Sequence, residues 1–153
     1  MKTVKVLKVN LQIRSIIFLL ISLVPIFATA AAKPALFYYG PANTTLDGIL
    51  QTRVYPGPPN YESVKRGDLA ETIWLIQLKR PVTVLDDKDP TSNNETETNV
   101  REIQLVIHSG RDQQILENYI GRPIKLTGIL FHAWSGHHHL KILMDVKSYR
   151  VKK

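Results

Sequence analysis

Four of the five histidines in this chain lie in one short segment, and they are the residues best suited to chemistry. They flank Ser135-Gly136, a pair typical of a tight β-turn, and are His132, His137, His138 and His139. In a hairpin with a two-residue turn, His132 faces His139 and Trp134 faces His137, because directly opposed residues share a face. Three neutral imidazoles on one face can bind zinc or copper and leave a position open for water. The spacing thus predicts a metal site of His132, His137 and His139.

The competing interpretation of this segment needs no metal. Adjacent histidines at a turn are also ordinary hydrogen-bonding residues, which here would shape the loop and cover Trp134. Metal-assisted hydrolysis would require a carboxylate as general base, and the first long loop offers Asp68, Glu71 and Glu62. The sequence contains no glycine-rich phosphate loop, nucleophile elbow or His-Glu-x-x-His motif. We therefore favour a non-enzymatic binding module, with a metal-binding or metal-dependent protein as the alternative.

A second segment with recognition chemistry is the proline-rich stretch at residues 55–63. Its stiffened backbone carries two tyrosines, a surface suited to a peptide or a sugar. The alternative is a rigid connector whose tyrosines cover the end of the fold. Trp74 lies in an apolar strand and is assigned to the core, whereas Trp134 beside the turn is the better ligand-facing aromatic. The predicted ligand-binding residues are Tyr55, Asn60, Tyr61, Glu62, Trp134 and His138.

The first thirty residues have the layout of a signal peptide. Four basic residues and no acid precede an apolar run and a group of alanines, with cleavage expected after Ala30 or Ala32. A retained membrane anchor is the alternative, although the run is shorter than the ~20 residues of a spanning helix. Cleavage leaves residues 31–153, which suffice for one domain with one core and no membrane span.

Composition narrows the partner class. The chain has 20 basic and 13 acidic side chains, but four of the basic ones belong to the leader, so the mature part has 16 against 13. This surplus disfavours nucleic acid, which calls for a basic patch. Cysteine is absent, which excludes disulfides and thiolate metal ligands. Export without disulfides fits a protein of a bacterial envelope, periplasmic or secreted.

The elements expected to position these residues are five strands and one helix. After an irregular lead-in at 31–45, the strands are predicted at residues 46–55, 72–85, 102–108, 124–133 and 138–151. Ser109 or Asp112 caps the helix, and Gly121 ends it. Residues 86–99 form a solvated acidic loop, whose spacing lacks the central glycine and closing glutamate of a calcium-binding loop.

This order predicts a mainly β fold, α+β by content. It matches a small five-stranded barrel of the oligonucleotide/oligosaccharide-binding (OB) type at 46–151, with one helix between strands three and four. A plain sheet with a helix on one face predicts the same order. Gly48 and Gly128 lie in repeated Leu-x-Gly-Ile-Leu phrases, which we interpret as equivalent bends, with a bulge at Gly128.

Several of these motifs together resemble a known family. They are the stretch from Gly57 to Ser63, Gly67-Asp68, residues 121–128 and the run from Phe131 to His139. The combination resembles the exported bacterial family called domain of unknown function 4431, over about residues 46–147. Leu140 stands where that family usually has a threonine.

The resemblance implies one compact exported domain in which the proline-rich stretch and the histidine segment act together. It carries no assigned reaction. The expected partner is therefore an envelope protein, a peptide or a glycan, bound at the face that these two segments form.

Overall fold

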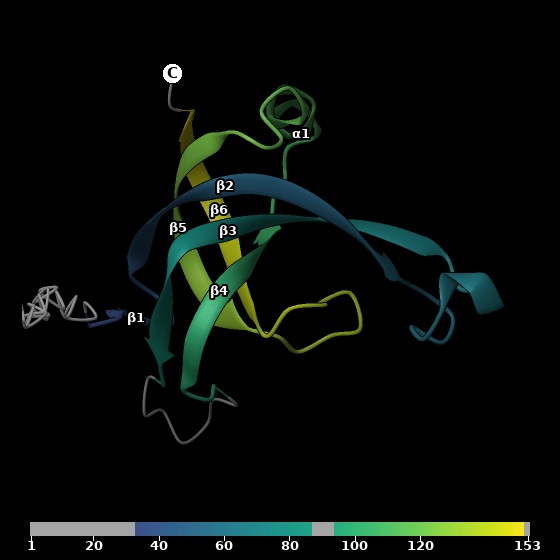
Figure 1. Ribbon diagram of the computed structural model, residues 1–153, viewed down its shortest axis with the longest axis horizontal. Coiled ribbons are helices and arrows are strands. Elements are labelled where there is room, and N and C mark those ends of the chain that lie inside the picture. The colour runs from purple at the N-terminus through teal and green to yellow at the C-terminus, as the bar shows by residue number, and fades with distance from the viewer. Residues whose placement is uncertain (1–32, 87–93, 152–153) are drawn as a thin grey trace, which may run out of the picture. The chain divides into compact units, whose positions relative to one another are not determined.

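The computed structural model describes residues 33–86 and 94–151, whose strands belong to one sheet (Figure 1). In chain order the elements are β1 Ala35–Tyr38, β2 Asn43–Pro56, the 3₁₀ helix η1 Val64–Arg66, β3 Ala70–Leu85, β4 Glu97–Val106, α1 Gly110–Glu117, β5 Pro123–His132 and β6 Ile142–Val151. The predicted leader, residues 1–30, and the centre of the predicted acidic loop, 87–93, lie outside the described residues. No helix in the described part of the chain combines the length and apolar character needed to cross a membrane.

Five of the strands close into a ring. The pairing runs β3-β2-β5-β6-β4, and β4 pairs again with β3. All of these pairs are antiparallel except β4 with β6, and α1 lies between the third and fourth ring strands in sequence. The predicted mainly β fold with five strands and one interposed helix is thereby confirmed.

The sixth strand, β1, corrects the expected irregular lead-in. It pairs in parallel with β3, from Ala35 opposite Val82 to Tyr38 opposite Leu85. The pairing of β2 with β3 ends at Gly48 opposite Leu78, a few residues earlier along β3. β1 therefore takes up pairing where β2 leaves off, a long-range opportunity that local composition does not reveal.

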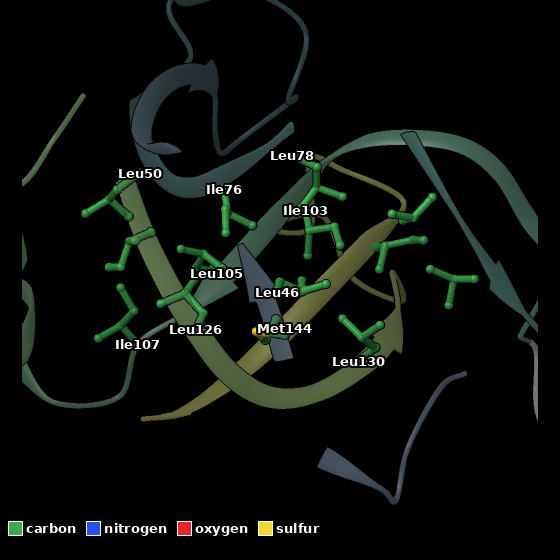
Figure 2. Close-up of a cluster of buried hydrophobic side chains, with 14 of the residues drawn as sticks. Leu46, Leu50, Ile76, Leu78, Ile103, Leu105, Ile107, Leu126, Leu130 and Met144 are labelled. Carbon is green, nitrogen blue, oxygen red and sulfur yellow. The ribbon is translucent and has the colours of Figure 1, made fainter. Parts of the chain in front are cut away.

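Alternating apolar residues of the ring strands point inward and form the core (Figure 2). Leu50, Ile76 and Leu126 are fully buried there, as is Met144. One face of each ring strand thus packs against this cluster. The opposite face, called the outer face, carries the alternate residues of the strand. Leu116 is the buried residue that α1 contributes, and the side chain of Ser109 caps this helix by accepting from the backbone N–H of Asp112, as predicted.

Two glycines allow the strands to approach closely where the ring bends. A Cβ on Gly48 would collide with the carbonyl oxygen of Gln77, and one on Gly128 would collide with that of Asp145. Each glycine thus brings its strand against the backbone of a neighbour, so the repeated Leu-x-Gly-Ile-Leu phrases mark equivalent places. The predicted bulge at Gly128 is wrong. The register of β5 and β6 does shift between Thr127 and Gly128, but the extra residue is Lys147 of β6, and β5 itself alternates without a break.

The predicted tight hairpin at Ser135-Gly136 is wrong. β5 and β6 stay paired only up to His132 opposite Ile142, and residues 133–141 form a loop closed by the Ala133 N–H donating to the Lys141 carbonyl at 2.8 Å. His132 therefore does not face His139. Leu130 lies in the core at this end of β5, because the strand keeps one alternation throughout. Partners on other strands hold the loop open, as described next.

Candidate functional site

The histidine loop, residues 133–141, lies across the outer face of the sheet. Leu75, Gln104 and Leu143 are successive cross-strand partners on β3, β4 and β6, and all three are buried although they lie outside the main core cluster. The amide of Gln104 donates to the carbonyl of His137 at 2.9 Å and accepts from the N–H of His139 at 2.8 Å. These bonds replace the cross-strand bonds of a hairpin, which explains why the predicted tight turn does not form.

Glu71 of β3 holds the histidine loop at a second point. Its two carboxylate oxygens each accept from an imidazole: Oε1 from His137 Nδ1 at 2.8 Å and Oε2 from His139 Nε2 at 3.1 Å. Burial by itself would raise the pKa of Glu71, but the hydrogen bonds from His139 and His137 outweigh it and leave the pKa below its ordinary value. The carboxylate is therefore ionised at neutral pH and sets which nitrogen of each imidazole carries the proton.

Two tyrosines pack against the same imidazoles. Tyr55, which is directly opposite Glu71 in the sheet, stacks on His139 with ring centroids 4.7 Å apart and planes 13° apart. The Tyr61 hydroxyl lies 3.4 Å from His137 Nε2, and its ring packs against Gly136, where a Cβ would lie 3.0 Å from the ring. Gly136 lies in a turn closed by the His138 N–H donating to the Ser135 carbonyl at 3.0 Å, and its lack of a Cβ allows the approach of Tyr61.

The proline loop, residues 57–69, is organised around one buried carboxylate. Asp68 accepts backbone N–H groups from Asn60 at 3.0 Å, Glu62 at 2.8 Å and Ser63 at 2.7 Å, and it also accepts from the Asn60 side chain. These bonds, with that from Ser63 the largest, lower the pKa of Asp68 to about 2 despite burial. Asp68 is therefore a structural anchor of the loop and not the general base considered for it.

The hydrogen bonds that Asp68 accepts hold Tyr61 in an unusual backbone conformation. Tyr61 has φ 58°, in the left-handed region that bulky residues rarely adopt. Its neighbours Asn60 and Glu62 are both fixed by Asp68, so the loop imposes this conformation and directs the ring of Tyr61 onto the histidine loop. A left-handed conformation costs free energy at a bulky residue, which supports a functional role for Tyr61.

Trp134 is the most exposed large side chain at this surface, with 78% of its area accessible. Its backbone N–H donates to His138 Nδ1 at 3.1 Å, and the two rings meet edge to face with centroids 5.0 Å apart. Burial first, and then repulsion from His137 and His139, lower the pKa of His138. A neutral His138 with a free lone pair on Nδ1 is what this bond requires, so the indole is displayed on a fixed backbone.

The third predicted metal ligand lies with a different carboxylate. His132 Nε2 is 3.4 Å from Glu97 Oε1, and Lys141 Nζ donates to the same Glu97 at 2.9 and 3.1 Å. His137 and His139 share Glu71 instead. Within residues 33–86 and 94–151, no group of three or more histidine, cysteine, aspartate or glutamate side chains is arranged to hold a metal ion. The structure thus does not bring the three predicted ligands together.

The predicted ligand-binding residues are brought to one surface in part. Tyr55 and Tyr61 contact the histidine loop, and Trp134 and His138 belong to it. The side chain of Asn60 instead donates to Asp68, and the side chain of Glu62 is exposed and forms an ion pair with Arg66 at 2.9 Å. Sequence reasoning missed Gln104 altogether, because its alternation placed it on a solvated face, and weighed Glu71 only as a base.

The comparisons with known proteins concern the histidine side of this surface. The family model described as Domain of unknown function (DUF4431) matches residues 102–151, which include Gln104 and the whole histidine loop but not the proline loop. The resemblance seen in the sequence spans more of the chain, residues 46–147. No curated protein matches the chain. Within residues 102–151, the chain is therefore similar to the family Domain of unknown function (DUF4431).

Proposed function

We propose that this chain is a non-enzymatic binding module whose ligand, a peptide or a glycan of an envelope or a segment of an envelope protein, contacts the joint surface of the proline and histidine loops. The observation that supports this most is the contact between the two loops, where the Tyr61 hydroxyl lies 3.4 Å from Nε2 of His137, an imidazole that Glu71 of β3 holds in place. Tyr61 and Trp134 are exposed on that surface, and the backbone N–H groups of both are hydrogen-bonded, to the Gly57 carbonyl and to His138 Nδ1 respectively. Rigid aromatic side chains with polar neighbours offer large contact area at little entropic cost.

The polar groups of this surface favour binding over catalysis. His137 and His139 both direct a nitrogen at Glu71, the backbone of the loop is engaged by Gln104, and His138 accepts from Trp134. These groups are used to hold the surface in place. What is left for a ligand is aromatic area and the outward edges of His137 and Tyr61.

The test is a titration of the purified protein with panels of soluble oligosaccharides and short peptides, measured by isothermal titration calorimetry. We expect a saturable change with one of these classes and binding about tenfold or more weaker in Trp134→Ala, as for a central aromatic contact. Leu36→Ala is the matched control, because Leu36 is a comparably exposed apolar residue on β1. Saturable binding that Trp134→Ala and Leu36→Ala weaken equally, or no binding of either class, would contradict the proposal.

We also propose that the chain acts after export, following cleavage of residues 1–30 or 1–32. The basic, apolar and small-residue order of this stretch supports it. Expression of the full chain in a bacterial host and N-terminal sequencing of the product test it. A product that begins at Ala31 or Lys33 is expected in the periplasm or medium, and an intact start at Met1 in the membrane fraction would instead support a retained anchor.

A further inference from the structure

Two rows of polar side chains cross the outer face of β2, β5 and β6, and they share no residue with the loops described above. Each row consists of residues directly opposite one another in the sheet. The first is a row of hydroxyls, Thr45, Thr127 and Ser148, and the second is a row of charges, Asp47, Lys125 and Arg150. The alternate residues Leu46, Ile124 and Leu126 are buried in the core, so the two rows face outward.

The charged row has two positive side chains and one negative side chain. Lys125 lies 3.3 Å from Asp47 on one side and directly opposite Arg150 on the other. In the described part of the chain, Arg150 forms no ion pair with any acidic group. Like charges placed directly opposite each other in a sheet are destabilising, so this arrangement is a cost to the fold that a bound anion would remove.

The hydroxyl row supplies donors beside these cations. Thr45 Oγ1 and Thr127 Oγ1 lie 3.0 Å apart, which fixes the rotamer of Thr127 next to Ser148. The surface is hollowed here into a cavity of about 330 Å³, lined by Lys125, Thr127, Ser148, Tyr149 and Arg150. The hydroxyl of Tyr149 is already used to donate to Asp112.

We infer that this hollow is a binding site for a tetrahedral oxyanion, a phosphate or sulfate group. The guanidinium of Arg150 offers paired donors that match two oxygens of such a group, and the ammonium of Lys125 offers a third charge-assisted contact. The hydroxyls of Thr127 and Ser148 can donate to the remaining oxygens. A carboxylate has too few oxygens for this donor set, and a neutral sugar would leave Arg150 uncompensated. The inference is independent of the function proposed for the two loops.

The test uses inorganic phosphate as the probe and ¹H–¹⁵N NMR spectra of the purified protein, with sodium chloride at matched ionic strength as reference. We expect saturable shifts of the Thr127 and Ser148 amides that chloride does not cause. Arg150→Gln should weaken phosphate at least about tenfold, and Thr127→Val, which keeps the shape and removes the hydroxyl, several-fold. Lys147→Gln removes the same charge from a neighbouring position of β6, which pairs with Asp145 at 2.6 Å, and should leave binding unchanged.

Shifts equal to those caused by chloride, or the same loss in Lys147→Gln as in Arg150→Gln, would overturn the inference. A second arm separates the sources of the oxyanion. Sedimentation with vesicles that contain phosphatidylglycerol, reversed by inorganic phosphate and lost in Arg150→Gln, would assign the site to a lipid headgroup. Phosphate binding without sedimentation would assign it to a free or soluble oxyanion.

Discussion

The proline loop and the histidine loop meet where Tyr61 contacts His137, yet they are held in opposite ways. The proline loop is self-contained, because Asp68 at its end gathers the backbone N–H groups of Asn60, Glu62 and Ser63 within the same loop. The histidine loop depends on distant partners: Gln104 from β4 and Glu71 from β3. One loop brings its own conformation to the surface, and the other acquires its conformation from the sheet beneath it.

This difference decides what could be known in advance. A local anchor such as Asp68 lies within a few residues of the groups that it binds, so the proline loop behaves as the stiff element expected from its composition. The shape of the histidine loop rests on a glutamine more than thirty residues earlier in the chain. No local pattern in residues 131–140 reveals that partner.

The variant that should test the dependent loop most severely is Gln104→Leu. It leaves the His139 N–H and the His137 carbonyl without partners under a buried surface, and we expect a loss of ~1–3 kcal/mol in the free energy of unfolding. Urea denaturation measures it. Gln77→Leu is the control: it is an exposed glutamine on β3 and should change stability by less than ~0.5 kcal/mol. Equal effects of the two variants would show that the histidine loop does not rest on Gln104.

The self-contained loop is tested by Asp68→Asn, whose amide nitrogen cannot accept. We expect the amides of Glu62 and Ser63 to exchange hydrogen about tenfold or more faster, while the amides of β5 and β6 stay protected. Because the pKa of Asp68 is about 2 when folded and 3.8 ordinarily, its contribution is present above pH 4 and is lost as the pH falls toward 2. Loss of protection across the whole sheet would mean that the loop is not an independent unit.

A smaller effect is expected from Glu71→Gln, which removes the charge that holds His137 and His139 of the histidine loop to β3. Since Glu71 and His137 are partly exposed, the loss of stability at pH 7 should stay under ~1 kcal/mol. The folded pKa of Glu71 is lowered, so its contribution is present above the ordinary pKa and is lost as the pH falls through the lowered one. Thermal unfolding at pH 7 and in acid below the lowered pKa measures this. The variant should differ from the native protein mainly at pH 7, and an equal difference at both values would exclude the charge as the cause.

Acid should loosen the histidine loop before the proline loop. The pKa of His138 is lowered in the folded protein, so the unfolded state binds the proton first and stability falls as the pH drops below about 6.5. Protonated Nδ1 can no longer accept from the Trp134 N–H. Fluorescence of Trp134 between pH 7.5 and 5.5 reports the change, and His108→Gln, which alters an exposed histidine paired with Asp145, should leave the transition in place. A transition that vanishes in this control belongs to His108 instead.

The smallest effect is expected where the proline loop carries only a surface contact. Glu62→Gln breaks the exposed ion pair with Arg66 and should cost no more than ~0.5 kcal/mol in the free energy of unfolding. Chemical denaturation with and without roughly 0.5 M salt, which screens exposed ion pairs, measures this cost. A larger loss, insensitive to salt, would show that Glu62 shapes the loop as Asp68 does.

Much of the fold could be predicted because the alternation of apolar and polar residues is visible within the sequence of each ring strand. Gly48 and Gly128 marked the places where strands approach each other, and Pro81 did not interrupt β3, since no pairing partner needs its missing N–H. β1 escaped prediction because four residues pair with a strand formed much later in the chain. Of the candidate site, the aromatic residues could be named from their types, but the carboxylate and amide that arrange them act across the sheet.

Lys147, the extra residue of β6 in its pairing with β5, determines which later side chains of β6 face the core and which face solvent. Before it Met144 and Val146 turn toward the core, and after it Tyr149 does, so the alternation of the strand changes phase at that residue. Ser148 and Arg150 reach the solvent only because of this change. If Lys147 instead took a regular position in the strand, the alternation would continue through it and turn Arg150 toward the core and Tyr149 toward water. Which side of the sheet the last residues of β6 present is thus decided by the accommodation of Lys147 as an extra residue.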